Sequence, residues 1–363
     1  MPITSTIWSI EPHTAMKHEI LRQYLKAWLP ILSRNNSRII YIDGFAGPGE
    51  YSGGEPGSPI IALETTIEHS LHLHERPVEF VFLFIEKDKA RADHLRMVIE
   101  KRFPIIPKNF IYHPLHADFK QQMTDLLKDL ESENLNLAPT FAFLDPFGYG
   151  ALPFDIIARI MRFRKCEVLI NFSYNSINRF IEAKDSREET FDEFFGITDW
   201  RAIRQITDSS ERLKRLTELY TSQLKTIAKF VRSFEMDDIS GNVAYYLFFA
   251  SNNINGLKYM KQAMSKVDPR YSYHFSDTTA GQRYLIEFDS KRGKESQADC
   301  IYSQFKGNTV TPEIIEEFVI AESPFPQLWK RDSLKVLERR NLIEVEGRSR
   351  RGTYPPGCRI RFR

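Results

Sequence analysis

Short apolar runs alternate with helical patterns between residues 38 and 172, and this alternation constrains the fold more than any other feature of the sequence. The runs are rich in β-branched and aromatic residues, which is typical of buried strands. They cover residues 38–42, 78–85, 109–113, 140–144 and 167–170. Such alternation predicts an α/β fold, an open and mostly parallel sheet with helices on both faces.

Acidic residues follow four of these predicted strands. They are Asp43, Glu86, Asp118 and Asp145. Ligands of open α/β sheets bind beyond the carboxyl ends of the strands, near the point where the strand order reverses. We therefore expect these side chains to contribute to one ligand site.

A glycine-rich segment, YIDGFAGPGEYSGGEPGSP, follows the first strand with six glycines and three prolines in residues 41–59. It is not a nucleoside-triphosphate loop, because Gly49 is followed by Glu50 rather than by a Lys-Ser/Thr pair. The spacing of Gly44, Gly47 and Gly49 also differs from the dinucleotide fingerprint. An acidic strand end before closely approaching glycines suits a ligand with an amino-acid portion, such as S-adenosylmethionine. The alternative is an ordinary tight turn.

Three of the four acidic strand ends have a predicted contact with that ligand. Asp43 is expected to face its ammonium group. Glu86 is expected to accept both ribose hydroxyls, or to be a solvated acid before Lys87. Asp118 is expected to accept the adenine amine or to cap the next helix. Lys17, beside His18 ahead of the first strand, is a candidate for the methionine end, or part of an ordinary cluster at the start of a helix.

The segment Asp145-Pro146-Phe147-Gly148 is the candidate acceptor site. A carboxylate beside a proline-stiffened turn and an aromatic ring can hold an amino group and stack a flipped base. The alternative is that Phe147 belongs to the core and Pro146 merely ends a strand.

The remainder of the first predicted domain is less regular. A helix is expected over residues 14–32 with Thr14 as a possible N-cap, and a charged helical insertion over about 182–228. A strand at 242–250, a helix at 256–266 and alternating residues over 271–288 complete a seven-stranded sheet.

The end of the chain follows the order of a winged helix-turn-helix. Helices are predicted at 312–320 and 333–340, then strands at 342–346 and 358–362 around a basic turn. Residues 331–363 hold ten basic and four acidic residues, so Arg348, Arg350 and Arg351 are candidates for binding nucleic acid, with Tyr354 available for stacking. Ordinary solvated charge is the alternative. We place the two domains at 1–290 and 291–363.

Several classes of protein are disfavoured. No apolar run is long enough for a membrane span, and the first residues do not form a signal peptide, so we expect a cytoplasmic protein without membrane contact. The three cysteines are isolated. His113 and His116 flank Pro114 on a predicted loop, so we expect no metal site.

The sequence resembles the three-Cys-motif partner family, TcmP. The resemblance rests on the stretches HTAMKHEILRQYLKAW, YIDGFAGPGEYSGGEPGSPIIALE, IEKD, FAFLDPFGYG and TPEIIEEFVIAESPF, followed by LKVLERRNLIEV, and it covers nearly the whole chain. It implies a bacterial protein with a Rossmann-like methyltransferase domain, a C-terminal winged helix and a three-Cys-motif protein as partner.

Two shorter motifs are similar to those of DNA methyltransferases. Phe45, Gly47 and Gly49 match the F-x-G-x-G cofactor motif. Asp145-Pro146 matches the first half of the D-P-P-Y motif of adenine amino methyltransferases. The sequence departs from that motif at Phe147-Gly148, and Tyr149 could take over the stacking role.

The leading hypothesis is therefore an S-adenosylmethionine-dependent methyltransferase that acts on an amino group of nucleic acid, DNA or RNA. The rival hypothesis is a non-catalytic methyltransferase-like module that binds nucleic acid or the partner, in a setting such as phage defence. An enzyme that uses another portion of the cofactor, or a nuclease, is a third hypothesis.

Overall fold

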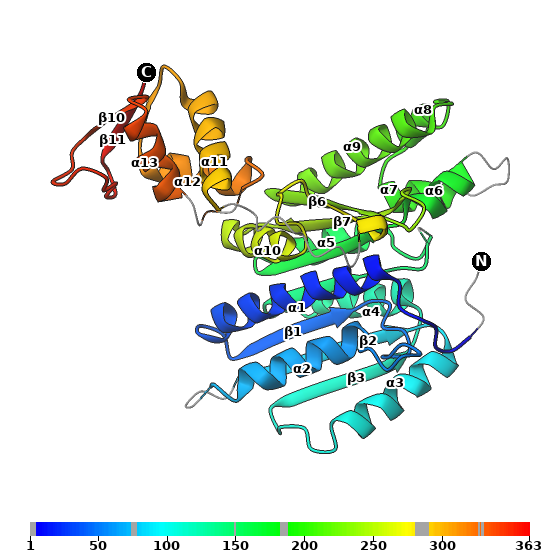
Figure 1. The fold of residues 1–363 in the computed structure, drawn as a ribbon. Coiled ribbons are helices and arrows are strands. Elements are labelled where there is room, and N and C mark those ends of the chain that lie inside the picture. Colours follow the sequence, from blue (N-terminus) through cyan, green and yellow to red (C-terminus); the bar gives the residue numbers. More distant parts are fainter. Residues whose placement is uncertain are drawn as a thin grey trace.

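The computed structural model describes residues 5–73, 78–148, 150–181, 188–279, 290–325, 327 and 330–363. The larger sheet has eight strands in the order β3-β2-β1-β4-β5-β7-β6-β8. Figure 1 labels β1, β2, β3, β6 and β7 of this sheet. Its strands are β1 (Arg38–Asp43), β2 (Glu79–Glu86), β3 (Phe110–His116), β4 (Thr140–Leu144), β5 (Cys166–Phe172), β6 (Phe230–Asp237), β7 (Val243–Ser251) and β8 (His274–Ser276).

Strand β7 is the exception to the parallel arrangement, because it runs antiparallel to both of its neighbours, β5 and β6. The expectation of seven strands is corrected to eight. The sequence analysis missed β6, and of the alternating residues 271–288 the structure describes a strand only at β8, with 280–289 outside the described residues.

Helices cover both faces of this sheet. Helices α1 (Pro12–Ser33), α2 (Ser58–Ser70), α3 (Lys89–Arg102) and α10 (Ile254–Val267) contribute to the core on one face. The core on the other face includes side chains of α4 (Phe119–Ser132), α5 (Phe154–Met161), α6 (Tyr174–Ile181), α7 (Glu188–Phe195) and α9 (Ser209–Ile227), with the short α8 (Trp200–Ile203) beside them. The expected helical insertion thus contains α7, α8 and α9.

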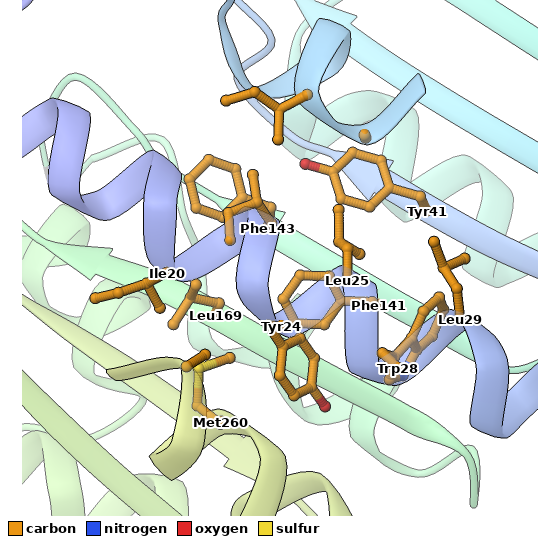
Figure 2. Close-up of a cluster of buried hydrophobic side chains, with 14 of the residues drawn as sticks. Ile20, Tyr24, Leu25, Trp28, Leu29, Tyr41, Phe141, Phe143, Leu169 and Met260 are labelled. Atoms are coloured by element: carbon orange, nitrogen blue, oxygen red, sulfur yellow. The ribbon is translucent and has the colours of Figure 1, made fainter. Parts of the chain in front are cut away.

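Helix α1 lies directly on the centre of the sheet, as Figure 2 shows. Its rings of Tyr24 and Trp28 lie 4.9 Å and 5.9 Å from the ring of Phe141 in β4. The helix begins at Pro12 with Glu11 as its N-cap, so the expected cap at Thr14 is wrong. Proline fits the first turn because the N–H it lacks would have no partner there. This packing carries Lys17 and His18 to the strand ends.

Strand β3 contains His113 and His116, which were expected on a loop. Pro114 does not break the strand, because β3 is an edge strand and its outer side needs no hydrogen-bond partner. In the register, Pro114 pairs with Phe84 of β2.

The C-terminal module (residues 290–325, 327 and 330–363) has its own core. It contains α11 (Ser290–Phe305), β9 (Thr309–Val310), α12 (Pro312–Ala321), α13 (Lys330–Arg339), β10 (Ile343–Glu346) and β11 (Arg359–Phe362). The three strands form an antiparallel sheet in the order β10-β11-β9. Both predicted helices and both predicted strands are present, while the winged-helix assignment and the domain division at 290/291 stay predictions.

Among the described residues, no helix combines the length and the apolar character that crossing a membrane requires.

Candidate ligand site at the strand ends

The glycine-rich turn after β1 depends on its glycines for different reasons. Gly47 and Gly49 have positive φ angles of 62° and 85°, which favour glycine. A Cβ on Gly44 would lie 2.7 Å from the ring of Phe119, and one on Gly49 would lie 2.6 Å from Leu95. A Cβ on Gly47 would meet no atom within 4 Å. Gly47 therefore presents bare backbone to open space, as a close-approach site requires.

Glu86 ties this turn to the end of β2. Its side chain is 6% exposed, and Oε2 accepts a hydrogen bond from the backbone N–H of Gly47 at 2.9 Å. Oε1 accepts another from the N–H of Asp88 at 2.8 Å. Each carboxylate oxygen has a second lone pair, so Glu86 can still accept hydrogen bonds from a ligand.

Asp43 is fully buried at the end of β1. The Tyr41 hydroxyl and the Phe45 N–H each donate to it at 3.3 Å. Burial raises the pKa of Asp43 to about 7, against the opposing hydrogen bonds from Ser58 and Phe45. The ring of Phe45 itself turns away and packs 5.0 Å from that of Phe119.

Asp145, beyond the end of β4, is held by two donors. Lys17 of α1 donates to Oδ2, and the Asn171 amide at the end of β5 donates to Oδ1 at 2.5 Å. Burial favours the neutral acid, but the Lys17 ammonium and both hydrogen bonds outweigh it, so the pKa of Asp145 lies below its ordinary value. Asp145 is thus an ionised carboxylate whose orientation is fixed.

His18 adds a neutral group to the same place. Burial, and then the neighbouring Lys17 charge, lowers the pKa of His18 to about 3. Among the described residues, its buried Nδ1 has no hydrogen-bond partner. A buried ring nitrogen in this condition is available to a ligand.

An aromatic layer lies beside the turn. The Trp8 ring lies 5.8 Å from Tyr51 and 5.7 Å from Phe147, and the Arg91 guanidinium lies over both Trp8 and Phe147, at 5.0 Å and 5.3 Å. The Trp8 carbonyl accepts from the N–H of Ser52 at 2.8 Å, which fixes the N-terminal segment to the turn. Phe147 remains 63% exposed, so its expected alternative role as a core residue is excluded.

Asp118 lies at the end of β3 and caps α4. Its Oδ1 accepts from the Gln121 N–H at 3.2 Å, and Lys87 pairs with it at 3.0 Å. Burial raises the pKa of Asp118, but these donors outweigh it, so the pKa lies below its ordinary value. The expected capping role is present, and its contact with adenine stays a prediction.

The structure brings several of the candidate residues together, and their functional roles stay predictions. The contacts described above link residues of α1 with residues at the ends of β1, β2 and β4. Pro146 follows Asp145 directly in the sequence. Tyr149 lies outside the described residues. Sequence reasoning missed Asn171 as a partner of Asp145, although it is a polar residue at a strand end. It also missed Trp8 and Arg91, for which no pattern in the sequence gave a signal.

The basic residues of the C-terminal module are not equivalent. Arg348 forms a bidentate ion pair with Glu338. Arg350 is exposed. The Arg351 side chain is 77% exposed and has one contact with Glu338, at 3.3 Å. Tyr354 is 7% exposed and donates to Glu338 at 2.9 Å, so the expected stacking role for Tyr354 is wrong.

Together, the strand order and the strand-end site define the class of the larger sheet. It is a Rossmann-like domain in which antiparallel β7 lies between β5 and β6, and β8 is added at the edge. The order reverses between β1, which ends at Asp43, and β4, which Asp145 follows, and ligands of such sheets bind at this reversal.

Comparison with solved structures gives distant similarities. A Legionella pneumophila protein of the family DUF519 is 13% identical, with a TM-score of 0.39, over 67% of this chain and 85% of that chain. Human methyltransferase-like protein 13, in complex with SAH, is 10% identical with a TM-score of 0.34, over 71% and 91% of the two chains. The plantazolicin methyltransferase BpumL, also in complex with SAH, is 11% identical with a TM-score of 0.32, over 66% and 86%. No protein-family model and no curated protein matches the sequence.

Proposed function

We propose that this protein is an S-adenosylmethionine-dependent methyltransferase that acts on an amino group of nucleic acid. The observation that carries the proposal is a glycine-rich turn at the reversal of the strand order, with the buried Asp43 bonded to its Phe45 N–H and Glu86 bonded to its Gly47 N–H. A turn with bare backbone beside two buried carboxylates fits a ligand that carries an ammonium group and a ribose.

The donors and acceptors at the site fit S-adenosylmethionine. Asp43 would take the ammonium group and Glu86 the ribose hydroxyls. The Lys17 ammonium has three N–H donors, so it can hold Asp145 and still reach the methionine carboxylate. The partnerless Nδ1 of His18 is a further polar contact for this end of the ligand.

On the acceptor side, Asp145 and Phe147 have distinct roles. The ionised Asp145 accepts a hydrogen bond from the acceptor amine and so orients its lone pair. The Lys17 charge nearby disfavours a protonated amine, which would have no lone pair. S-adenosylmethionine supplies the electrophilic methyl group. The exposed ring of Phe147 offers a face on which a base can stack.

Support for a nucleic-acid acceptor comes from Phe147 and from the exposed Arg350 and Arg351. The participation of a three-Cys-motif partner is proposed from the sequence resemblance alone. Cytoplasmic location stays part of the same proposal.

The test is calorimetric titration with S-adenosylmethionine, followed by transfer of a labelled methyl group to DNA and RNA. We expect a micromolar dissociation constant, about −8 kcal/mol, weakened by Asp43→Asn and by Glu86→Gln. Asp93→Asn, a partly exposed acid of α3, is the matched control and should bind as the wild type does. Asp145→Asn should bind the cofactor and lose transfer. Full transfer by Asp145→Asn would remove this residue from the mechanism.

The rival, a non-catalytic binding module, has one observation in its favour. Lys17 already forms an ion pair with Asp145 and occupies one of its two carboxylate oxygens. In this case cofactor binding would be normal, and no methyl transfer to DNA, RNA or protein would be measured, with or without a three-Cys-motif protein.

A further inference from the structure

Three potential metal ligands lie on one face of the sheet, apart from the strand-end site. Glu235 and Asp237 are two residues apart in β6, so their side chains point to the same face. His274 lies in the neighbouring strand β8, directly opposite Glu235 in the register. Two features, the alternation of side chains along β6 and its parallel pairing with β8, thus bring an imidazole and two carboxylates together.

The distances suit a single bound ion. One ligand atom from each residue lies within 4.8 Å of the other two. Nε2 of His274 is 2.7 Å from Oδ2 of Asp237 and 3.7 Å from Oε1 of Glu235. Ligand atoms about 2.1 Å from one ion are separated by roughly 3 to 3.5 Å, so small side-chain movements would place all three around it.

Two further observations separate this cluster from an ordinary ion pair. Asp237 is only 9% exposed, yet among the described residues its buried Oδ1 has no hydrogen-bond partner. The Tyr246 hydroxyl, from β7, donates to Oε2 of Glu235 and fixes this carboxylate with Oε1 turned toward His274. An ion pair between His274 and Asp237 explains neither the unsatisfied oxygen nor the convergence of Glu235.

We propose that Glu235, Asp237 and His274 bind a divalent transition metal ion. An imidazole with two carboxylates suits Zn²⁺ or Mn²⁺, whereas Mg²⁺ and Ca²⁺ prefer ligand sets of oxygen alone. The side chains of His274 and Glu235 are 40% and 33% exposed, so water can occupy the remaining coordination positions. Tyr246 is a positioning residue that orients Glu235.

The proposed metal site is distinct from the strand-end site. Phe234 and Met236 alternate with the two ligands of β6 and belong to the core that α1 and α10 cover. Glu235 and Asp237 therefore face the opposite side, where α9 packs beside Tyr246. The metal site does not depend on the proposed methyltransferase function.

The expectation of no metal site came from searching for ligands close together in the sequence. Glu235 and His274 are brought together by the pairing of β6 with β8, and β6 itself was not predicted. No local spacing of residues could have revealed them.

The experiment is calorimetric titration of the full chain with ZnCl₂ and with MnCl₂. We expect one equivalent bound by the wild type and at least about a hundredfold loss of affinity in His274→Ala. Tyr246→Phe should weaken binding by about 10- to 100-fold, as loss of a group that orients a ligand does in other metal sites. The isosteric variants Glu235→Gln and Asp237→Asn keep side-chain volume, and circular dichroism verifies the fold of each variant.

His113→Ala, an exposed histidine of β3, is the matched control and should keep the bound equivalent. The proposal is overturned if the wild type binds neither ion below millimolar concentration. It is equally overturned if the bound equivalent persists in His274→Ala, since the ion would then be held by other side chains.

Discussion

Asp43 is an acidic residue of the strand-end site that ionises near neutral pH. It is fully buried, and burial raises its pKa to about 7, with the charge of nearby Asp145 acting in the same direction. A ligand ammonium group beside it would favour the carboxylate. Because the apo protein holds much of Asp43 protonated at pH 6, ligand binding there must include loss of that proton.

We therefore predict that the affinity for S-adenosylmethionine rises as the pH increases from 6 to 7. A carboxyl group with a pKa of about 7 is roughly 10% ionised at pH 6 and half ionised at pH 7, so the expected gain is about fivefold. The range stops at pH 7 because α-amino groups themselves begin to titrate at about pH 7.7. Calorimetry at several pH values, in buffers of different ionisation enthalpy, measures both the gain and the proton released.

Asp43→Asn is the control for this prediction, since its amide cannot ionise. Its affinity should be lower and should not change between pH 6 and pH 7. A wild-type affinity that is equally flat over this range would show that Asp43 does not take the ammonium group.

At the scale of the element, two glycines of the glycine-rich turn are required for different reasons, one for core packing and the other for the approach of a ligand. Gly44 has no room for a Cβ between Phe119 and Leu144, whereas Gly47 has a positive φ and open space in front of it. The two glycines are only three residues apart, yet they are needed for different reasons. Gly44 is needed for packing in the interior, and Gly47 is needed for the approach of the predicted cofactor.

Substituting each glycine by alanine tests this separation. Gly44→Ala should lower the free energy of unfolding by about 1–3 kcal/mol through overpacking. Gly47→Ala should cost roughly 1–2 kcal/mol, the price of a left-handed conformation, and should also weaken S-adenosylmethionine binding by more than Gly44→Ala does. Urea denaturation and calorimetry on the same samples measure both. Equal affinities in the two variants would contradict the cofactor role of Gly47.

The elements also show which parts of the fold the sequence could predict. Strands β1, β2, β4 and β5 are apolar because they are buried on both faces, and each was predicted. Strand β6 was missed because Arg232, Ser233, Glu235 and Asp237 interrupt its apolar residues, as one-sided burial near a sheet edge permits. At the site, acids at strand ends could be predicted, because parallel strands end together. The Lys17 and Asn171 contacts with Asp145 could not, because they depend on how α1 packs on the sheet and how β5 pairs with β4.

At the scale of the whole molecule, the C-terminal module is attached through polar contacts to the end of α12. The Lys261 side chain of α10, 1% exposed, donates to the carbonyls of Val319, Ile320 and Ser323 at 2.8–2.9 Å. Tyr273 donates to the carbonyl of Pro324 at 2.8 Å. Figure 1 shows α12 beside the end of α10.

Lys261 satisfies the carbonyls that a helix leaves without partners at its C-terminus. Burial lowers the pKa of Lys261 to about 6, but three hydrogen bonds require the three N–H groups of the ammonium form. We therefore expect the attachment of α12 to α10 to weaken when the Lys261 side chain is removed.

We predict that Lys261→Met loosens α12 without unfolding the larger sheet. Methionine keeps most of the apolar volume, but the Ile320 carbonyl loses its side-chain donor, at a cost of about 1–3 kcal/mol. The carbonyls of Val319 and Ser323 keep donors in the Ser323 hydroxyl and in Arg232. Hydrogen exchange followed by mass spectrometry should show faster exchange in residues 312–325, while peptides from β1 and β4 keep wild-type protection. Lys266→Met, on the same helix but exposed, is the matched control and should leave exchange unchanged. If residues 312–325 exchange equally slowly in Lys261→Met, the apolar contacts of Ile320 with the core beneath α10 hold the module, and the lysine is dispensable.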